Sequence, residues 1–315
     1  MIKKSMKNIR VLDLFCGAGG FSSGFSSQDF SVTGIDINPR AAEIFAINNI
    51  GDFVQKDLLT ENIEGSFGII LGGPPCRPFS SVNVRRRGES HPNYPLVARY
   101  FDHISRLRPD LFFMENVPPV RNYPVFMESV EKIRNEGYYV GHEVIHYSDF
   151  GAATKRRRLI VFGGRDEALV KKIVGKFNER KKAPRTVGEA IKKYENVAFG
   201  DYPDHVWPHF KTIHKYKDKY QSGQYGWYKL DYSQPAPSFG NVMKTYILHP
   251  ESGNNGTPVR VISIREAMEI MGFSPEFRFP KDMGVGSRYQ MVVDVVSPVI
   301  SEILAGVVKE CYVKT

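Results

Sequence analysis

A cysteine on a stiff turn and a glutamate at the end of an apolar run are the residues of this chain best suited to chemistry. Cys76 closes the turn Gly72-Gly73-Pro74-Pro75-Cys76, in which two prolines fix the backbone ahead of the sulfur. Glu115 follows the apolar run Leu111-Phe112-Phe113-Met114. A thiol held in one place suits nucleophilic attack, and a carboxyl at a strand end suits proton donation to a ring nitrogen. Each also has a plainer explanation: a buried small hydrophobe for Cys76, and an ion pair or helix cap for Glu115.

Basic residues gather around both positions. Arg77 follows the cysteine directly, and the run Arg85-Arg86-Arg87 lies further along. Such cations favour a nearby thiolate and attract phosphate, although a charge run is usually a solvated face. The run Lys155-Arg156-Arg157-Arg158 enters another apolar segment, where strand alternation puts Arg156 and Arg158 on one face. The sequence therefore predicts two guanidinium groups that converge on one pocket.

A glycine-rich turn indicates a bound nucleotide. An apolar segment runs into Asp13-Leu14-Phe15-Cys16-Gly17-Ala18-Gly19-Gly20, where glycines let the backbone turn sharply and approach a ligand. Asp36 follows about 20 residues later, where acceptors for ribose hydroxyls usually stand, and Asp57 is placed to accept from an adenine amino group. Ser22 replaces the third glycine of G-x-G-x-x-G, which favours an adenosyl ligand without pyrophosphate. A nicotinamide-type loop or an ordinary tight turn is the alternative.

Composition favours a globular protein with a polyanionic partner. The 315 residues are 42% hydrophobic, and 43 Lys and Arg against 34 Asp and Glu give a formal charge of +9, which suits nucleic acid. Three widely spaced cysteines and the lack of an apolar secretion segment predict a reducing, cytoplasmic setting in which Cys76 stays a thiol. We expect no membrane partner, because no apolar stretch approaches the roughly 20 residues that span a bilayer.

The chemistry-bearing residues need elements to position them, and alternating strands and helices supply these up to residue 165. This alternation is typical of a doubly wound α/β sheet. We expect strands at residues 10–14, 31–37, 53–56, 67–71, 111–114, 138–145 and 159–163. We expect helices at residues 21–26, 39–48, 96–107 and 126–136.

The second half of the chain changes character. A Lys-rich, helix-like stretch extends to Tyr194, and a Tyr, Trp, Pro, Gly and His-rich region covers residues 198–258. Periodicity fades there, which predicts a small loop-rich domain. A helical pattern returns at residues 261–271, and residues 292–308 form an apolar helix that can pack on the sheet. His205 and His209 stand four apart, but Pro208 disfavours a helix and no third ligand is evident, so we predict no metal.

In order along the chain, these motifs resemble those of the C5-cytosine DNA methyltransferases. The match covers the turn at Asp13 to Gly20, Pro74-Pro75-Cys76, Glu115-Asn116-Val117, Arg156-x-Arg158, and the helix from Arg260 to Phe273. It extends over about residues 9–300 and leaves only the recognition region unmatched. The resemblance implies a doubly wound mixed sheet of the class I, Rossmann-like type that uses S-adenosylmethionine and releases S-adenosylhomocysteine, with a smaller loop-rich target-recognition domain.

The resemblance also implies domains and roles. Residues 1–185, completed by 283–315, are expected to form the catalytic and cofactor domain, 186–262 the target-recognition domain and 263–282 a hinge. The implied catalytic residues are Cys76, Glu115, Arg156 and Arg158. The implied cofactor residues are Asp13, Phe15, Cys16, Gly17, Gly19, Gly20, Asp36, Ile37, Asp57, Leu58, Pro74, Leu96 and Asp294. The expected DNA contacts are Arg77, Ser80, Arg85, Arg86, Arg87, Lys215, Lys217, Tyr225 and Trp227.

The implied activity is methyl transfer to C5 of a cytosine flipped out of a specific duplex DNA site, with Cys76 bonded to C6. We expect a monomer in the cytoplasm, associated with the nucleoid and paired in function with a restriction endonuclease. The alternatives are a tRNA cytosine-C5 methyltransferase and a catalytically silent DNA-binding relative.

Four positions depart from the pattern of the family. Arg77 and Thr154 stand where the family has Gln, Asn93-Tyr94-Pro95 replaces an acidic-x-Arg pair, and Val293-Asp294 replaces Gly-Asn. An acid facing the methionine carboxylate would repel it. We therefore expect either weak cofactor binding or another orientation for Asp294.

Overall fold

The computed structural model describes residues 8–80, 88–211, 213–216, 219–220, 227–254 and 256–312. The chain forms two compact units. Unit 1 comprises Met1–Ile145, Arg157–Lys181 and Ile300–Thr315, and unit 2 comprises His146–Arg156 and Lys182–Val299. Residues 146–156 and 283–299, which the sequence assigned to the catalytic domain, thus pack within unit 2. How the predicted domains divide the function stays a prediction.

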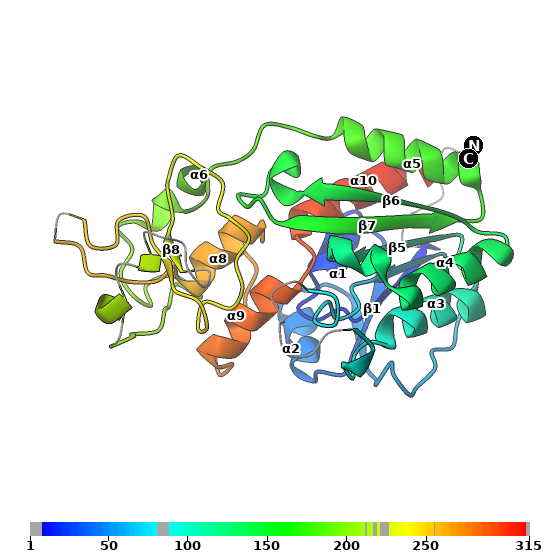
Figure 1. Cartoon of the computed structure of the whole chain (residues 1–315), viewed down its shortest axis with the longest axis horizontal. Coiled ribbons are helices and arrows are strands. Elements are labelled where there is room, and N and C mark those ends of the chain that lie inside the picture. The colour runs from blue at the N-terminus through cyan, green and yellow to red at the C-terminus, as the bar shows by residue number, and fades with distance from the viewer. Residues whose placement is uncertain are drawn as a thin grey trace. The chain divides into compact units, whose positions relative to one another are not determined.

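Unit 1 is built on a seven-stranded sheet with the order β3-β2-β1-β4-β5-β7-β6. Figure 1 labels β1, β5, β7 and β6 of this sheet. The strands are β1 (Arg10–Leu14), β2 (Ser31–Asp36), β3 (Asp52–Gln55), β4 (Ile69–Gly72), β5 (Leu111–Asn116), β6 (Tyr139–His146) and β7 (Arg157–Gly164). The pairs from β3 across to β5 are parallel, and β5 pairs with β7 in antiparallel register. The expected doubly wound mixed sheet is confirmed. Since the strand order reverses between β1 and β4, the loops after these strands meet at one edge, where such sheets bind ligands.

Helices cover both faces of this sheet because its strands are apolar on both sides. They are α1 (Gly20–Ser26), α2 (Arg40–Ile47), α3 (Leu96–Leu107), α4 (Pro124–Asn135), α5 (Glu167–Glu179) and α10 (Pro298–Tyr312). Successive residues of β5 point to opposite faces. Phe112 contacts Tyr100 and Phe101 of α3, whereas Phe113 contacts Phe25 of α1. Helix α10 packs so closely on α1 that a Cβ on Gly24 would lie 2.3 Å from backbone.

The C-terminal apolar segment corrects two expectations. The single helix predicted at residues 292–308 is wrong: α9 (Val285–Asp294) ends before an extended Val295, and Pro298 opens α10. Proline is well suited to the first turn of a helix. Contrary to the expectation from composition, residues 285–312 are long and apolar enough to span a membrane, and an 18-residue stretch within them has a mean hydropathy of 2.0. Because 67% of this 18-residue stretch is buried, packing within the protein accounts for its apolar character.

Unit 2 is rich in loops, as the sequence predicted. It contains α6 (Val187–Ile191), α8 (Ile264–Met271), α9 and a short parallel pair, β8 (Tyr228–Lys229) with β9 (Ile247–Leu248). Helices α6 and α8 both begin with a capping box, in which a Thr or Ser side chain and a Glu three residues later satisfy the first backbone donors. The whole of α8 is buried, so this helix forms the centre of the unit.

Candidate active site

The segment after β1 makes a tight turn with unusual backbone angles. Phe15, Gly17 and Gly19 have positive φ values of 62°, 52° and 75°. The left-handed conformation is strained for Phe15 by roughly 1–2 kcal/mol but is open to glycine. A Cβ on Gly17 would meet no atom within 4 Å. The turn thus leaves the open backbone that a nucleotide-binding loop requires.

Two carboxyl groups support this turn. Asp36 accepts hydrogen bonds from N of Gly17 (2.9 Å) and N of Asn38 (2.8 Å), and burial raises its pKa. Asp13 accepts at Oδ2 from Oγ of Ser22 (2.6 Å), while its buried Oδ1 has no hydrogen-bond partner among the residues that the structure describes. Burial, more than the nearby charge of Asp36, raises the pKa of Asp13 to about 7. A buried acceptor of this kind fits a ligand that donates hydrogen bonds.

The other predicted cofactor residues of unit 1 follow strand ends or open a helix. Asp57 follows β3 and accepts at Oδ1 from a backbone N–H two residues on (2.9 Å). Leu58 is buried, whereas Ile37, after β2, is 61% exposed, and Leu96 begins α3. Cys16 is buried, and burial raises the pKa of its thiol well above the ordinary value. A buried thiol of this kind is a weak nucleophile, and the predicted contact of Cys16 with the cofactor stays a prediction.

The loop after β4 holds Cys76 at the rim of the sheet. Cys76 is partly exposed and packs against the edge of the hydrophobic core. Asn116, fully buried at the end of β5, donates from Nδ2 to O of Pro74 (2.9 Å) and accepts at Oδ1 from N of Val117 (2.8 Å). One amide side chain therefore joins the cysteine loop to the strand that carries Glu115. The sequence analysis missed this role, although a polar residue ending an apolar strand was a signal for it.

Glu115 and Arg158 form an ion pair across neighbouring strands. Nε of Arg158 lies 2.8 Å from Oε1 of Glu115, and the two side chains are only 10% and 8% exposed. The antiparallel register sets Glu115 opposite Ile160 and so brings the two side chains close. Arg158 also donates from Nη1 to O of Arg157 (2.8 Å). A carboxylate and a guanidinium are thus held together in a largely dry setting.

Arg156 has a different partner from Arg158. Its Nη2 donates to O of Val293 (2.6 Å), within unit 2. Strand β7 begins at Arg157, so Arg156 precedes the strand and the alternation that was expected to align it with Arg158 does not extend to it. The assignment of Arg156 to the reaction stays a prediction.

Two of the positions that depart from the resemblance have clear surroundings. Thr154 is buried, and a parallel bridge pairs it with Ala236; its Oγ1 donates to O of Pro237 (3.4 Å). Asp294 is exposed, and its Oδ2 accepts from Nε2 of Gln290 (2.8 Å), one turn earlier in α9. Thr154 therefore has a packing role, and Gln290 sets the orientation of the Asp294 carboxylate.

The residues predicted to contact DNA divide into two groups. Arg85, Arg86, Arg87, Lys217 and Tyr225 lie outside the described residues. Of the others, Arg77 and Lys215 are exposed, and Ser80 and Trp227 are half-buried. Trp227 stacks on Tyr246 with ring centres 4.8 Å apart, and Lys219 lies over the indole at 5.1 Å. Trp227 thus belongs to an aromatic cluster of unit 2, and its contact with DNA stays a prediction.

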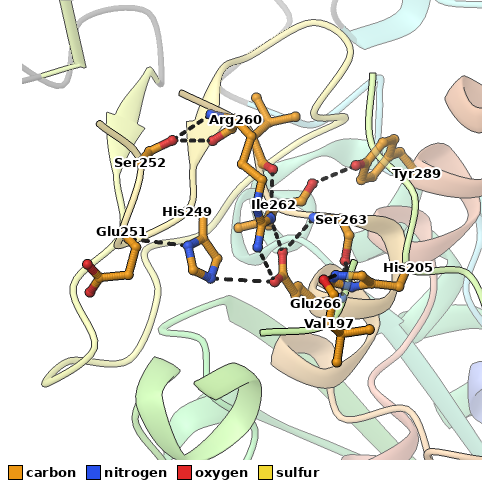
Figure 2. A network of polar contacts seen from close by, with 11 residues as sticks. Val197, His205, His249, Glu251, Ser252, Arg260, Ile262, Ser263, Glu266 and Tyr289 are labelled. Atoms are coloured by element: carbon orange, nitrogen blue, oxygen red, sulfur yellow. Dashed lines mark hydrogen bonds and ion pairs between the residues drawn. The ribbon is translucent and has the colours of Figure 1, made fainter. Parts of the chain in front are cut away.

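A buried polar network fastens α8 to the loop that precedes it, as Figure 2 shows. Both Nη atoms of Arg260 lie 2.8 Å from the two carboxylate oxygens of Glu266, which also accepts from N of Ser263 (2.7 Å). Burial by itself raises the pKa of Glu266, but the hydrogen bonds and charge of Arg260 outweigh it and the pKa is lowered. Nε2 of His249 lies 3.5 Å from the same carboxylate, and Ser252 bonds both backbone groups of Arg260. The network fixes both ends of the loop at residues 249–260.

Comparisons with known proteins agree with this architecture. The family model of the C-5 cytosine-specific DNA methylases matches residues 9–310. The type II methylase M.HgiDII of Herpetosiphon aurantiacus is 25% identical over 85% of this chain and 85% of its own length. The type II methyltransferase M.FnuDI of Fusobacterium nucleatum is 25% identical over 96% and 94%. The crystal structure of the S. pombe Dnmt2 methyltransferase covers 96% of this chain and 98% of its own, with a TM-score of 0.70 at 15% identity. With its family model matched along nearly the whole length, the chain belongs to the C-5 cytosine-specific DNA methylase family and is a DNA (cytosine-5-)-methyltransferase.

Proposed function

We propose that the enzyme methylates C5 of a cytosine flipped out of a specific duplex DNA site, with S-adenosylmethionine as donor and a bond between Cys76 and C6 as the intermediate. The observation that carries this is the link from Asn116 to Pro74, which places the cysteine loop beside the strand end where Glu115 pairs with Arg158. A thiol, a carboxyl group and a guanidinium are the three groups that activation of a pyrimidine ring needs.

The residues around the first turn fit an adenosyl ligand. The open backbone at Gly17 lets a ligand approach closely, and the buried Oδ1 of Asp13 and the carboxylate of Asp36 are acceptors for amino and hydroxyl donors. Phe15 and Asp57 are proposed to meet the adenine, and Ile37, Leu58 and Leu96 to contact the cofactor beside them. S-adenosylmethionine, when bound, supplies an electrophilic methyl group, and S-adenosylhomocysteine is the expected product.

In the proposed reaction, Cys76, Glu115 and Arg158 act on the ring of the cytosine. The Cys76 thiolate forms a bond to C6 of the cytosine, and the electrons of the C5–C6 double bond move onto C5 as Glu115 holds N3 or, in its acid form, protonates it. Arg158 holds Glu115 and contacts the base at O2. After C5 accepts the methyl group, a base removes the C5 proton, the double bond reforms, the bond from C6 to sulfur breaks and N3, where it was protonated, returns its proton to Glu115. Flipping is required because a stacked base hides its ring face from a thiolate.

The partner is proposed to be double-stranded DNA, in keeping with the net charge of +9. Arg77, Ser80, Lys215 and Trp227, with the arginine run at residues 85–87, are the proposed contacts. DNA affinity is then expected to fall steeply with salt. The names of the type II relatives support a role beside a restriction endonuclease, and we propose a monomer that acts in the cytoplasm on the nucleoid.

Two experiments test the proposal. Labelled methyl groups are expected to pass from S-adenosylmethionine to duplex DNA with the wild type and not with Cys76→Ser. Label in tRNA alone would contradict the DNA substrate, and label in neither would favour a silent relative. DNA with 5-fluorocytosine at the target is expected to trap a covalent adduct, since fluorine at C5 cannot leave as a proton. Efficient methylation of normal DNA without such an adduct would exclude the Cys76 intermediate.

A further inference from the structure

Arg99, at the end of the first turn of α3, reaches across to the turn that follows β3. Its Nε donates to O of Leu58 (3.0 Å), and its Nη2 donates to O of Glu61 (3.0 Å) and to Oδ1 of Asn62 (3.1 Å). Its Nη1 lies 3.8 Å from Oδ2 of Asp102. All three guanidinium nitrogens thus have a partner, and two of them hold backbone carbonyls near opposite ends of one turn.

This turn, at residues 57–62, orients the Asp57 carboxylate. O of Asp57 accepts from N of Glu61 (2.8 Å), and N of Asp57 donates to Oε1 of Glu61 (2.9 Å). Within the turn only Leu58 is buried in the hydrophobic core, while residues 59–62 are exposed. Apolar packing therefore anchors Leu58. The exposed part of the turn is held by the guanidinium of Arg99 and by Lys56, whose Nζ lies 3.3 Å from Oε2 of Glu61.

We propose that Arg99 is a positioning residue for the methyl donor, because it holds Asp57 and Leu58 where they contact the cofactor. The inference rests on the proposed use of S-adenosylmethionine by this site. The same helical turn begins with Leu96, which is proposed to line the pocket. One turn of α3 then carries both Leu96 and the arginine that holds the turn at residues 57–62.

The geometry demands arginine rather than a simple positive charge. A planar guanidinium donates in several fixed directions at once, whereas an ammonium is a single point on a flexible stem. Arg99→Lys retains at most part of the contacts, and Arg99→Ala retains none. Loss of the ion pair with Asp102 is a minor effect, because this contact is long and partly exposed and Lys132 also binds Asp102 at 2.8 Å.

The test is calorimetric titration of the full-length protein with S-adenosylmethionine and with S-adenosylhomocysteine. We expect Arg99→Ala to weaken both by about tenfold, with Arg99→Lys intermediate. The matched control is Arg106→Ala, an exposed arginine two turns further along the same helix, which should bind as the wild type does. In steady-state assays, the KM for the donor should rise in Arg99→Ala while kcat at saturating donor stays within about twofold.

The affinity of Arg99→Ala for the donor decides whether Arg99 is a positioning residue. Binding by Arg99→Ala equal to the wild type overturns the inference alone, and so does a fall in kcat at saturating donor with unchanged affinity. A wild type that binds no S-adenosylmethionine overturns the proposed function, and the inference with it. If Arg99→Ala does not fold, Asn62→Ala removes one of the acceptors at the exposed surface, and weaker donor binding by it and by Arg99→Lys supports the proposal. Wild-type binding by both would overturn it.

Discussion

At the scale of single residues, the ion pair of Arg158 with Glu115 leads to a prediction about the rate of the reaction. Arg158→Lys keeps the charge but replaces a planar donor held 2.8 Å from Oε1 of Glu115 with a flexible ammonium. We expect kcat to fall by about 100-fold while the protein stays folded. The control is Arg157→Lys at the exposed neighbouring position, which should keep most of the activity. Equal rates for both variants would show that the geometry of the pair does not matter to the reaction.

Asp294 offers a second prediction for a single side chain, because it replaces an asparagine expected from the resemblance. Asp294→Asn keeps an acceptor for Nε2 of Gln290 and removes one negative charge. If the carboxylate repels the donor's own carboxylate, the dissociation constant for S-adenosylmethionine should fall about threefold to tenfold. Titration calorimetry measures this, with the exposed Glu276→Gln as the charge-matched control. An unchanged affinity in Asp294→Asn would mean that this carboxylate does not face the donor.

The residues proposed for the site differ in how readily the sequence reveals them, for a physical reason. Cys76 and Glu115 stand out because each is a reactive group at the end of an apolar run. Asn116 and Arg99 act through hydrogen bonds to backbone carbonyls distant in sequence. Every residue has such a carbonyl, so the type of the partner residue gives no sign of the contact. Partners of this kind become visible only once the strands are paired and the helices packed.

At the scale of the elements, the contact between the cysteine loop and the end of β5 is the one that we expect to hold Cys76 in place. Asn116→Ala removes the donor to Pro74 O and leaves that buried carbonyl without its partner, at a cost of about 1–3 kcal/mol in the free energy of unfolding. We expect the loop to loosen and the rate of adduct formation with 5-fluorocytosine DNA to fall more than DNA affinity does. The matched control is Asn135→Ala, at the exposed end of α4. Adduct formation at the wild-type rate in Asn116→Ala would contradict a role in holding the cysteine.

The elements themselves were predictable where the pattern was strong. The strand at residues 10–14 and the helix at 96–107 match β1 and α3 in both bounds, because an apolar strand and an amphipathic helix have distinct periods. The prediction of one helix at 292–308 was wrong because the residues remain apolar on both sides of the point where the helix breaks. Val295 is extended and Pro298 opens a new helix, and only the proline was a signal for that.

For the whole molecule, composition predicted a large α/β unit with a loop-rich companion but not how the chain is shared between them. Residues 146–156 leave the sheet region and pack within unit 2 before β7 returns to unit 1. In that excursion, Lys155 donates from its backbone to O of Ala236 (2.8 Å), and Arg156 bonds Val293. Such pairings join segments more than 80 residues apart, and no local pattern encodes them.

The stability of the molecule should depend on pH through a buried histidine of α3. His103 is fully buried, neither ring nitrogen has a hydrogen-bond partner among the described residues, and burial lowers its pKa to about 4. The unfolded chain protonates at about pH 6.5, so it binds more protons than the folded state between about pH 6.5 and 4, and stability falls as the pH falls through this window. His103→Leu removes the effect and should lessen the loss between about pH 7 and pH 5 by on the order of 2 kcal/mol. Urea unfolding at both pH values measures it, with His209→Leu as the exposed control. If His103→Leu loses as much stability as the wild type on acidification, the histidine is protonated in the folded protein or is not the group that titrates.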